Sequence, residues 1–331
     1  MIDREFKSLP FLSGGHRQTL VAYLIKGKRR PYRAIQHFLD VDETDQTVLH
    51  DDCPPGWKPT DPVVLMLHGL AGCHGSDYMV RIAGKLNERG VRTFRMDHRD
   101  CGAAVGRSRR PYHSGISQDL LAAWQTVGSL CPGSPGAVVG FSMSANILLK
   151  TAGTCGWSLD DPASPRCAVA VNPPIDLEQC SRALHRRQNR VYVKHFVDLL
   201  VKSVERRLLK FPSAPKPLWK IPPRTLREFD DLYTAPASGF SGVSDYYTRC
   251  SANQFIESIR IPTLILTAED DPMIPPDPFR ELPVVDGVTV HIAPSGGHMG
   301  YLGCKADDPD RRWMDWRVIG WLLPHLNANS V

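Results

Sequence analysis

A serine placed between a short apolar run and a helix-like run is the feature that most constrains how this chain can fold. The segment 140–144 reads Gly-Phe-Ser-Met-Ser, with the β-branched run 137–139 before it and a helix-forming run, 145–150, after it. A strand that turns directly into a helix strains the residue at the turn, so its neighbours must be small. Such a turn holds a hydroxyl clear of the sheet, beside an N–H at a helix start. The sequence therefore predicts an α/β protein with Ser142 as a candidate nucleophile.

One flank of this turn departs from the usual pattern, which has glycine on both sides of the serine. Position 144 holds a serine in this chain. Because a hydroxymethyl group is small, we expect the turn to tolerate Ser144.

A nucleophilic serine needs a base and a carboxylate, and one common chain order is serine, then acid, then histidine, each in a loop after a strand. A strand predicted at 261–268 is followed at once by Glu269, Asp270 and Asp271. The pattern does not decide which of these three residues is the acid. Asp270 is also suited to accept backbone N–H bonds within the turn, and Glu269 is the weaker rival.

The predicted base is His298, in a glycine-rich loop after a strand predicted at 288–292. Gly296, Gly297 and Gly300 surround it and indicate a loop with special backbone angles. His291 lies inside the strand, and we interpret it as structural. Both strands deliver their candidates at their carboxyl ends, where open parallel sheets build their sites. The combined pattern predicts a Ser-His-Asp hydrolase site.

The strand predicted at 63–67 is continuously apolar, which is typical of parallel sheets, and leads into His68-Gly69-Leu70. In proteins with a nucleophile turn of this kind, the loop after this strand supplies one N–H of the oxyanion hole and the residue after the serine supplies the other. We therefore assign the two donors to the backbone of Leu70 and Met143. Each such donor is worth roughly 10²–10³ in rate. The side chain of His68 is expected to bond neighbouring loops.

Size and composition indicate one domain, residues 1–331, of a globular protein with 42% hydrophobic and 23% charged residues. The net charge of +5 does not call for a nucleic-acid partner. The nine cysteines form no C-x-x-C pair, and no zinc-ligand spacing or phosphate-binding glycine loop is present, so we predict no metal and no cofactor. The start, Met1 to Lys7, lacks a signal-peptide core, and no apolar run reaches 18 residues. A cytoplasmic location is expected.

Residues 176–250 are predicted to form a cap inserted after the sixth strand, 167–171. Ten basic residues fall between Arg182 and Lys216, and apolar residues interleave with them at helical spacing from Val191 to Leu209. Three interpretations remain open: an amphipathic helix packed on the body, a lid over an acyl pocket, and a helix that docks on a membrane surface. Elsewhere the sequence predicts an edge hairpin at 33–52, strands at 91–96 and 137–141, and helices at 78–89, 116–130 and 313–323.

Several further segments resemble the YheT-like α/β-hydrolases, the hydrolase-4 subgroup, along almost the whole chain. The segments that carry this resemblance are Pro10 to Thr19, His68-Gly69-Leu70, Tyr112-His113-Ser114-Gly115 with Asp119, Phe229-Asp230-Asp231, Gly239-Phe240, Asp245-Tyr246-Tyr247, Asp270-Asp271-Pro272 and Gly296-Gly297-His298. The resemblance implies the α/β-hydrolase fold, with a mostly parallel central sheet flanked by helices and a helical cap after the sixth strand.

The resemblance also implies Ser142 as nucleophile, Asp271 as acid and His298 as base. Asp271 is preferred because relatives commonly place the acid four residues before a proline, here Pro275. Asp100 stands where relatives usually have glycine, in a loop that faces the site, and is expected to influence substrate preference. We interpret His113 as a structural link between loops, with substrate contact as the alternative.

Members of this family look like carboxylic-ester hydrolases, and some eukaryotic members act on phospholipids. The sequence therefore predicts a serine esterase that forms an acyl-enzyme on a small-molecule or lipid ester. An acyltransferase with the same triad and a non-catalytic protein of the same fold are the alternatives. Stable membrane insertion is not expected, whereas peripheral contact is left open. The sequence predicts neither the acyl length nor the oligomeric state.

Overall fold

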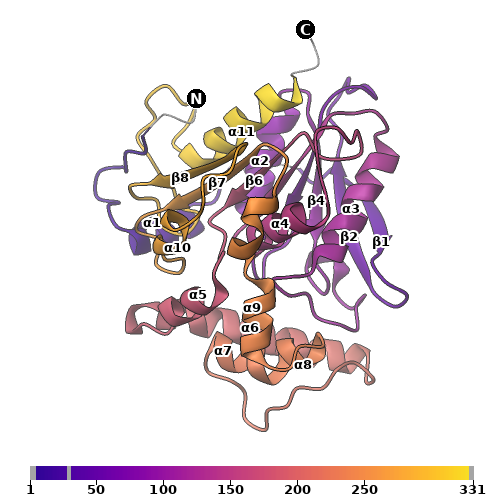
Figure 1. Ribbon diagram of the computed structural model, residues 1–331, viewed down its shortest axis with the longest axis vertical. Helices are drawn as coiled ribbons and strands as arrows, with labels where there is room; N and C mark the ends of the chain where they lie inside the picture. The colour runs from indigo at the N-terminus through magenta and orange to yellow at the C-terminus, as the bar shows by residue number, and fades with distance from the viewer. Residues whose placement is uncertain (1–4, 28–30, 328–331) are drawn as a thin grey trace.

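A computed structural model describes residues 5–27 and 31–327 of the chain. Within these residues, eight strands form one sheet in the order β1-β2-β4-β3-β5-β6-β7-β8 (Figure 1). The hairpin of β1 and β2 is antiparallel and joins β4, and the strands from β4 to β8 are parallel. The strands are β1 (Ile35–Asp40), β2 (Gln46–Asp52), β3 (Val63–Leu67), β4 (Arg92–Asp97), β5 (Gly136–Phe141), β6 (Cys167–Val171), β7 (Thr263–Ala268) and β8 (Val288–Ala293).

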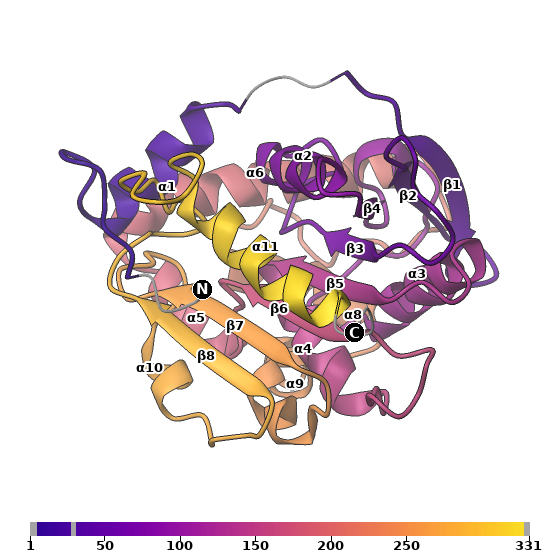
Figure 2. The same ribbon diagram turned by 90° about the horizontal axis from the view of Figure 1, so that it is seen from above.

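Helices cover both faces of the sheet and one of its ends. They are α1 (Gly15–Leu24), α2 (Asp77–Asn87), α3 (Ser117–Leu130), α4 (Met143–Thr154), α5 (Leu177–Leu184), α6 (Arg190–Lys210), α7 (Leu226–Phe229), α8 (Ala235–Ala237), α9 (Val243–Cys250), α10 (Asp277–Arg280) and α11 (Trp313–Leu326). Figure 2 shows α2 and α11 on one side of the sheet and α3 and α4 on the other. No helix within the described residues is long and apolar enough to cross a bilayer.

The central strands are buried on both faces, which explains their continuous apolar sequences. Every residue of β3, β5 and β6 is buried. In β3, Val64 and Met66 pack with α2 and α11, whereas Leu65 and Leu67 pack with α3 and α4. This alternation follows from the two-residue period of a strand.

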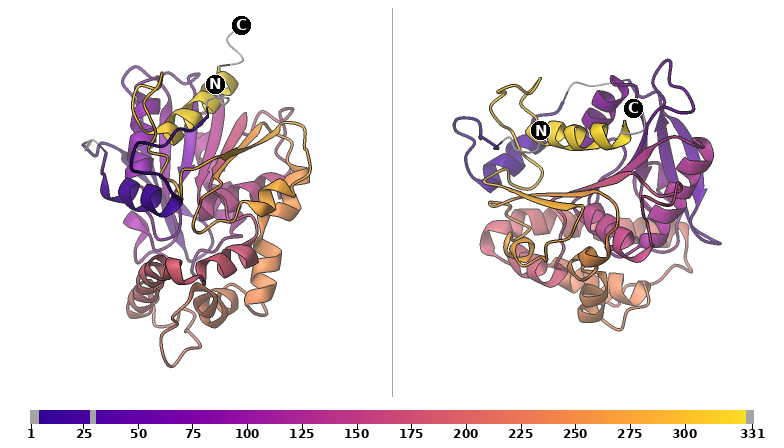
Figure 3. Two further views of the ribbon diagram at one scale, coloured as in Figure 1. Left: turned by 90° about the vertical axis from the view of Figure 1, so that its left-hand side faces the viewer. Right: turned by 45° about the horizontal axis from the view of Figure 1, so that its top comes forward.

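The segment between β6 and β7 carries α5 to α9, which lie together beyond the carboxyl ends of the strands (Figures 1 and 3). We call residues 176–250 the cap segment. Its longest helix, α6, runs through the amphipathic stretch and ends at Lys210, before Pro212. Val193, Val197 and Val204 face inward along it. The cap segment therefore stands over the edge of the sheet where the candidate residues emerge.

Candidate active site

Ser142 sits at a sharp turn between β5 and α4. Its φ of 52° and ψ of −121° are unfavourable for a residue with a side chain. Its N–H donates to the carbonyl of Val171 on β6 at 2.8 Å, which holds the turn against the sheet. A Cβ at Gly140 would lie 2.5 Å from the Ser144 carbonyl oxygen, and one at Gly69 would lie 3.0 Å from the Ser142 Cβ. Close backbone packing therefore excludes a side chain at Gly140, and a side chain at Gly69 would require Ser142 to shift.

Three side chains from distant parts of the sequence form a continuous hydrogen-bonded chain. Ser142 Oγ lies 2.9 Å from His298 Nε2. His298 Nδ1 lies 2.8 Å from Asp271 Oδ2. They come from the turn after β5, the loop after β8 and the loop after β7. Hydroxyl, imidazole and carboxylate are thus in the order that a nucleophile, base and orienting acid require.

The structure distinguishes between the two neighbouring aspartates. Asp271 Oδ1 accepts the N–H groups of Met273 at 2.8 Å and Ile274 at 3.1 Å, so Oδ2 is directed toward His298. Asp270 instead accepts the N–H of Gly297 at 2.8 Å. Burial raises the pKa of Asp270. Asp271 contacts the imidazole, whereas Asp270 binds the backbone of the histidine loop.

Sequence reasoning missed the residues that hold the acid and the base in place. Asn172 donates to Asp271 Oδ2 at 2.8 Å, and Tyr301 donates to the Asn172 side-chain oxygen at 3.1 Å. Thr19 Oγ1 accepts the N–H of His298 at 2.9 Å. Asn172 directly follows β6 and has a φ of 46°, a conformation that asparagine tolerates well. Its place after a predicted strand was the available signal.

The expected oxyanion donors lie beside the serine. The N–H of Gly69 donates to Tyr78 Oη and that of Ala71 to Tyr112 Oη, both at 2.9 Å. Within the described residues, no acceptor takes the Leu70 N–H between them. Met143 is the first residue of α4, where N–H groups have no intrahelical acceptor. Leu70 and Met143 line the same cavity as Ser142 and His298.

Ser144 has a structural role at the start of α4. Its hydroxyl is fully buried, donates to the carbonyl of His68 and lies 2.6 Å from His98 Nε2. Burial lowers the pKa values of His68 and His98, so both imidazoles are neutral at pH 7. His68 also bonds neighbouring backbone groups, as expected: its Nδ1 contacts the Gly69 carbonyl and its Nε2 accepts the His98 N–H.

Asp100 itself does not line the cavity beside Ser142, although its neighbours Ser203 and Arg207 do. Its φ of 57° explains why glycine suits this position. Its buried carboxylate accepts the Ser203 hydroxyl at 2.6 Å and lies 3.4 Å from Arg207 Nη2, both on α6. Asp100 therefore links the loop after β4 to α6 of the cap segment. Its influence on substrate preference would pass through α6.

A cavity of about 140 Å³ lies between Ser142 and the cap segment, and its lining is mainly apolar. Phe196, Leu200 and Phe229 line it from the cap side. His113 also lines it, and its ring contacts Phe240 and Tyr246, so it both links the loop to the cap segment and borders the cavity. Burial lowers the pKa of His113 to about 3.

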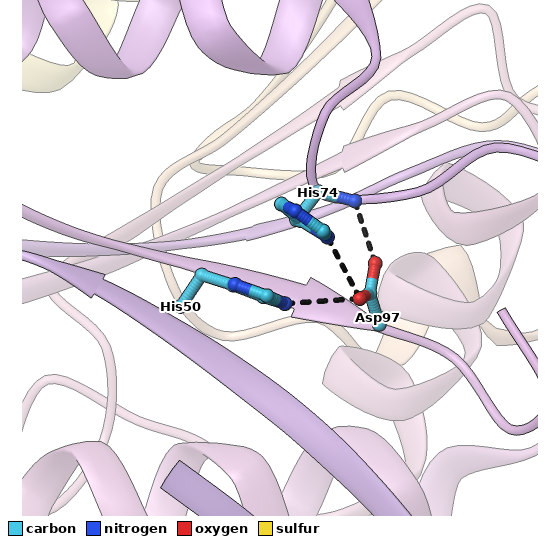
Figure 4. A group of neighbouring side chains, drawn as sticks. All are labelled: His50, His74 and Asp97. Atoms are coloured by element: carbon cyan, nitrogen blue, oxygen red, sulfur yellow. Dashed lines mark hydrogen bonds and ion pairs between the residues drawn. The ribbon is translucent and has the colours of Figure 1, made fainter. Parts of the chain in front are cut away.

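Three residues outside this site could in principle hold a metal ion. His50, His74 and Asp97 converge near the ends of β2 and β4 (Figure 4). Asp97 Oδ2 lies 2.9 Å from His50 Nε2 and 2.8 Å from His74 Nδ1. Although burial favours the protonated carboxyl, these hydrogen bonds hold the pKa of Asp97 well below its usual range.

The geometry of this cluster fits a hydrogen-bonded network better than a metal centre. The two imidazole rings stack with centroids 3.5 Å apart, and both ring nitrogens point at Asp97 Oδ2 at hydrogen-bond distance. The Asp97 carboxylate also accepts the backbone N–H groups of His74 and Ala103. The absence of a bound metal stays a prediction. The search of the sequence for metal-ligand spacing overlooked this group, because its members are far apart in sequence.

Comparisons with known proteins agree with this architecture. Residues 64–314 match the model of the alpha/beta hydrolase family. YheT, a predicted esterase of Escherichia coli (strain K12), is 31% identical over 98% of this chain and 95% of its own length. Phospholipase ABHD3 of mouse is 29% identical over 73% of this chain, which spans only 59% of that protein.

A solved esterase structure from Pyrococcus furiosus has a TM-score of 0.60, with 16% identity over 91% of this chain and 96% of that one. At this identity, the likeness concerns the fold alone. The expected α/β-hydrolase fold and the resemblance to YheT-like proteins are confirmed.

Proposed function

Because the chain belongs to the alpha/beta hydrolase family, we propose that it is a serine hydrolase that cleaves carboxylic esters through an acyl-enzyme. The observation that carries the proposal is the unbroken series of contacts from Ser142 through His298 to Asp271. The names of its relatives, an esterase and a phospholipase, support ester hydrolysis as the reaction.

In the first half of the proposed reaction, Ser142 Oγ attacks the ester carbonyl carbon while His298 Nε2 accepts the hydroxyl proton. Asp271 holds the imidazole and stabilises its cationic form. The carbonyl oxygen gains negative charge and receives hydrogen bonds from the N–H groups of Leu70 and Met143. The C–O bond to the alcohol then breaks, and His298 gives the alcohol its proton.

In the second half, water enters where the alcohol stood and His298 Nε2 removes a proton from it. The resulting hydroxide attacks the acyl carbon, and the same two N–H groups bind the oxyanion. Ser142 leaves with the proton from His298, and the carboxylic acid is released. One water is consumed, and the enzyme returns to its starting state.

The cavity suits the acyl chain of the substrate, since Phe196, Leu200 and Phe229 give it an apolar wall. We propose that residues 176–250 serve as a cap within a single hydrolase domain, and that the substrate is a small-molecule or lipid ester. All nine cysteines are free, which supports a reducing, cytoplasmic setting.

The proposal is tested by hydrolysis of p-nitrophenyl acetate and butyrate. Ser142→Ala is expected to lower kcat by about 10⁴-fold or more. Ser129→Ala, which changes an exposed serine on α3, is the control and should retain full activity. Equal rates for wild type and Ser142→Ala would reject the assignment. Analysis of the products with an added alcohol separates hydrolysis, which releases free acid, from acyl transfer, which yields a new ester.

A further inference from the structure

A group of large apolar side chains is exposed where α1 lies against the start of α6. Tyr23 and Leu24 near the end of α1 are 70% and 72% exposed, and Val191 at the start of α6 is 72% exposed. Leu20 and Ile25 are also exposed. The helices meet through stacked His16 and Tyr192 rings and through an edge contact of Tyr23 with His195. These contacts place the two helices side by side, as the ribbon shows (Figure 3, left).

Phe11, in the turn that precedes α1, is a further exposed apolar side chain. The N–H of Leu12 donates to the carbonyl of Leu9, which closes a β-turn with Phe11 at its third position. Phe11 has a φ of 67°, where glycine is usual, and its side chain is 91% exposed. A strained turn thus presents an aromatic ring to the outside, and burial in the protein does not explain it.

Arginines border these apolar residues on the side of the cap segment. Arg186 and Arg187 lie in the turn between α5 and α6, Arg190 is the first residue of α6, and all three are exposed. None of the three has a carboxylate within ion-pair distance among the residues that the structure describes. We call Phe11, Leu20, Tyr23, Leu24, Ile25 and Val191, with these three arginines, the α1–α6 surface.

The α1–α6 surface adjoins the candidate active site through both of its helices. Thr19 of α1 accepts the backbone N–H of His298. On α6, the side opposite the exposed residues supplies Phe196 and Leu200 to the cavity wall. A substrate held at this surface would therefore lie one helix thickness from the cavity.

We propose that the α1–α6 surface docks the protein on an anionic lipid bilayer, from which ester substrates reach the cavity. Exposed apolar and aromatic side chains enter the boundary between headgroups and acyl chains, and unpaired arginines bind lipid phosphates. The charge of the three unpaired arginines complements anionic headgroups, whereas a second copy of this chain would bring like charges together. The inference rests on the proposed function because it names the lipid class of that site's substrate.

Vesicle flotation of the full-length protein tests this inference. Vesicles of phosphatidylcholine mixed with phosphatidylglycerol are expected to carry the protein upward, and vesicles of phosphatidylcholine alone much less. The variant Arg186→Gln, Arg187→Gln, Arg190→Gln is expected to lose affinity on the order of 100-fold, at about tenfold or less per charge. Phe11→Ser with Leu24→Ser should lose about tenfold or more.

The loop after α6 offers matched controls, since Leu218 and Ile221 are exposed there beside Lys216, Lys220 and Arg224. Two control variants should leave flotation unchanged. One is Lys216→Gln, Lys220→Gln, Arg224→Gln, and the other is Leu218→Ser with Ile221→Ser. All these variants should hydrolyse p-nitrophenyl butyrate like the wild type. Ser142→Ala should float like the wild type, which separates docking from catalysis.

Three results would overturn the inference. The first is failure of the wild type to float with anionic vesicles. The second is an equal loss in the control variants, which would indicate general attraction of a basic protein. The third is that the wild type elutes as a dimer in size-exclusion chromatography and the variant Phe11→Ser with Leu24→Ser elutes as a monomer. That result would show that a second copy covers this surface.

Discussion

Asp270 and Asp271 are adjacent in sequence, but only Asp271 contacts the imidazole of His298. Asp271→Asn is expected to lower kcat for p-nitrophenyl butyrate by about 10⁴-fold, because the amide favours the wrong tautomer of the histidine. Asp270→Asn keeps an oxygen that can accept the Gly297 N–H, so its loss should stay below about tenfold. Steady-state kinetics of both variants measures the difference in kcat. A larger loss in Asp270→Asn than in Asp271→Asn would show that Asp271 is not the acid.

A second prediction for a single residue concerns the contribution of Ser144 to stability. Its hydroxyl bonds both the His68 carbonyl and His98 Nε2 in a fully buried position. Ser144→Gly restores the common glycine but leaves these buried groups unpaired, so the free energy of unfolding should fall by about 1–3 kcal/mol. Urea denaturation measures it. An increase in stability would show that the hydroxyl only fills space.

At this scale, the sequence was sufficient to identify residues that follow strands and carry chemistry. Ser142, His298 and the pair of aspartates were predicted because each lies in a turn or loop that follows an apolar run. Asn172 also follows a predicted strand, but its role could not be predicted, because it depends on a contact between the end of β6 and the loop after β7. The bond of Asp100 to Ser203 and its pairing with Arg207 could not be predicted, because they depend on how α6 packs on the loop after β4.

At the scale of elements, Asp100 and Arg207 connect the body to α6. Arg207 is almost fully buried and lies 3.4 Å from the carboxylate, whereas the neighbouring Arg206 is 54% exposed and 3.9 Å away. Arg207→Met leaves the buried Asp100 carboxylate without its nearest cation, so the free energy of unfolding should fall by about 3 kcal/mol or more. Arg206→Met is the matched control and should change it by less than about 1 kcal/mol. Equal effects in urea denaturation would contradict the link.

Helices and strands with a clear hydrophobic pattern could be predicted from the sequence, and short ones without such a pattern could not. Continuous apolar runs gave the parallel strands, and α2, α3, α6 and α11 followed from helical spacing. The short helices α7 and α8 and the π-helical turn Asp230–Thr234 carry too few residues for a period to be visible. Their shape depends on packing of Phe229, Tyr233 and Trp219 against α6.

For the whole molecule, buried neutral histidines set the response to acid. Burial lowers the pKa values of His68 and His98 in the folded state, whereas the unfolded chain has a histidine pKa of about 6.5. Below that pH the unfolded state binds more protons, so stability falls as pH decreases, by up to about 1.4 kcal/mol per pH unit for each histidine.

Replacing one of these histidines should therefore flatten the dependence on pH. His98→Phe loses the bond to Ser144 and is expected to be less stable at pH 7, but its stability should fall less steeply between pH 6.5 and pH 5. His195→Phe changes an exposed histidine and serves as the control. Urea denaturation across this range measures both slopes, and identical slopes for wild type and His98→Phe would contradict the burial argument.

The covalent intermediate tests the central claim most directly. Wild-type protein turning over p-nitrophenyl butyrate is quenched with acid, and its intact mass and peptides are measured. We expect an added mass of one butyryl group on the peptide that contains Ser142, and none in Ser142→Ala. Turnover with no acylated protein, or with the acyl group on a different residue, would contradict the proposed mechanism.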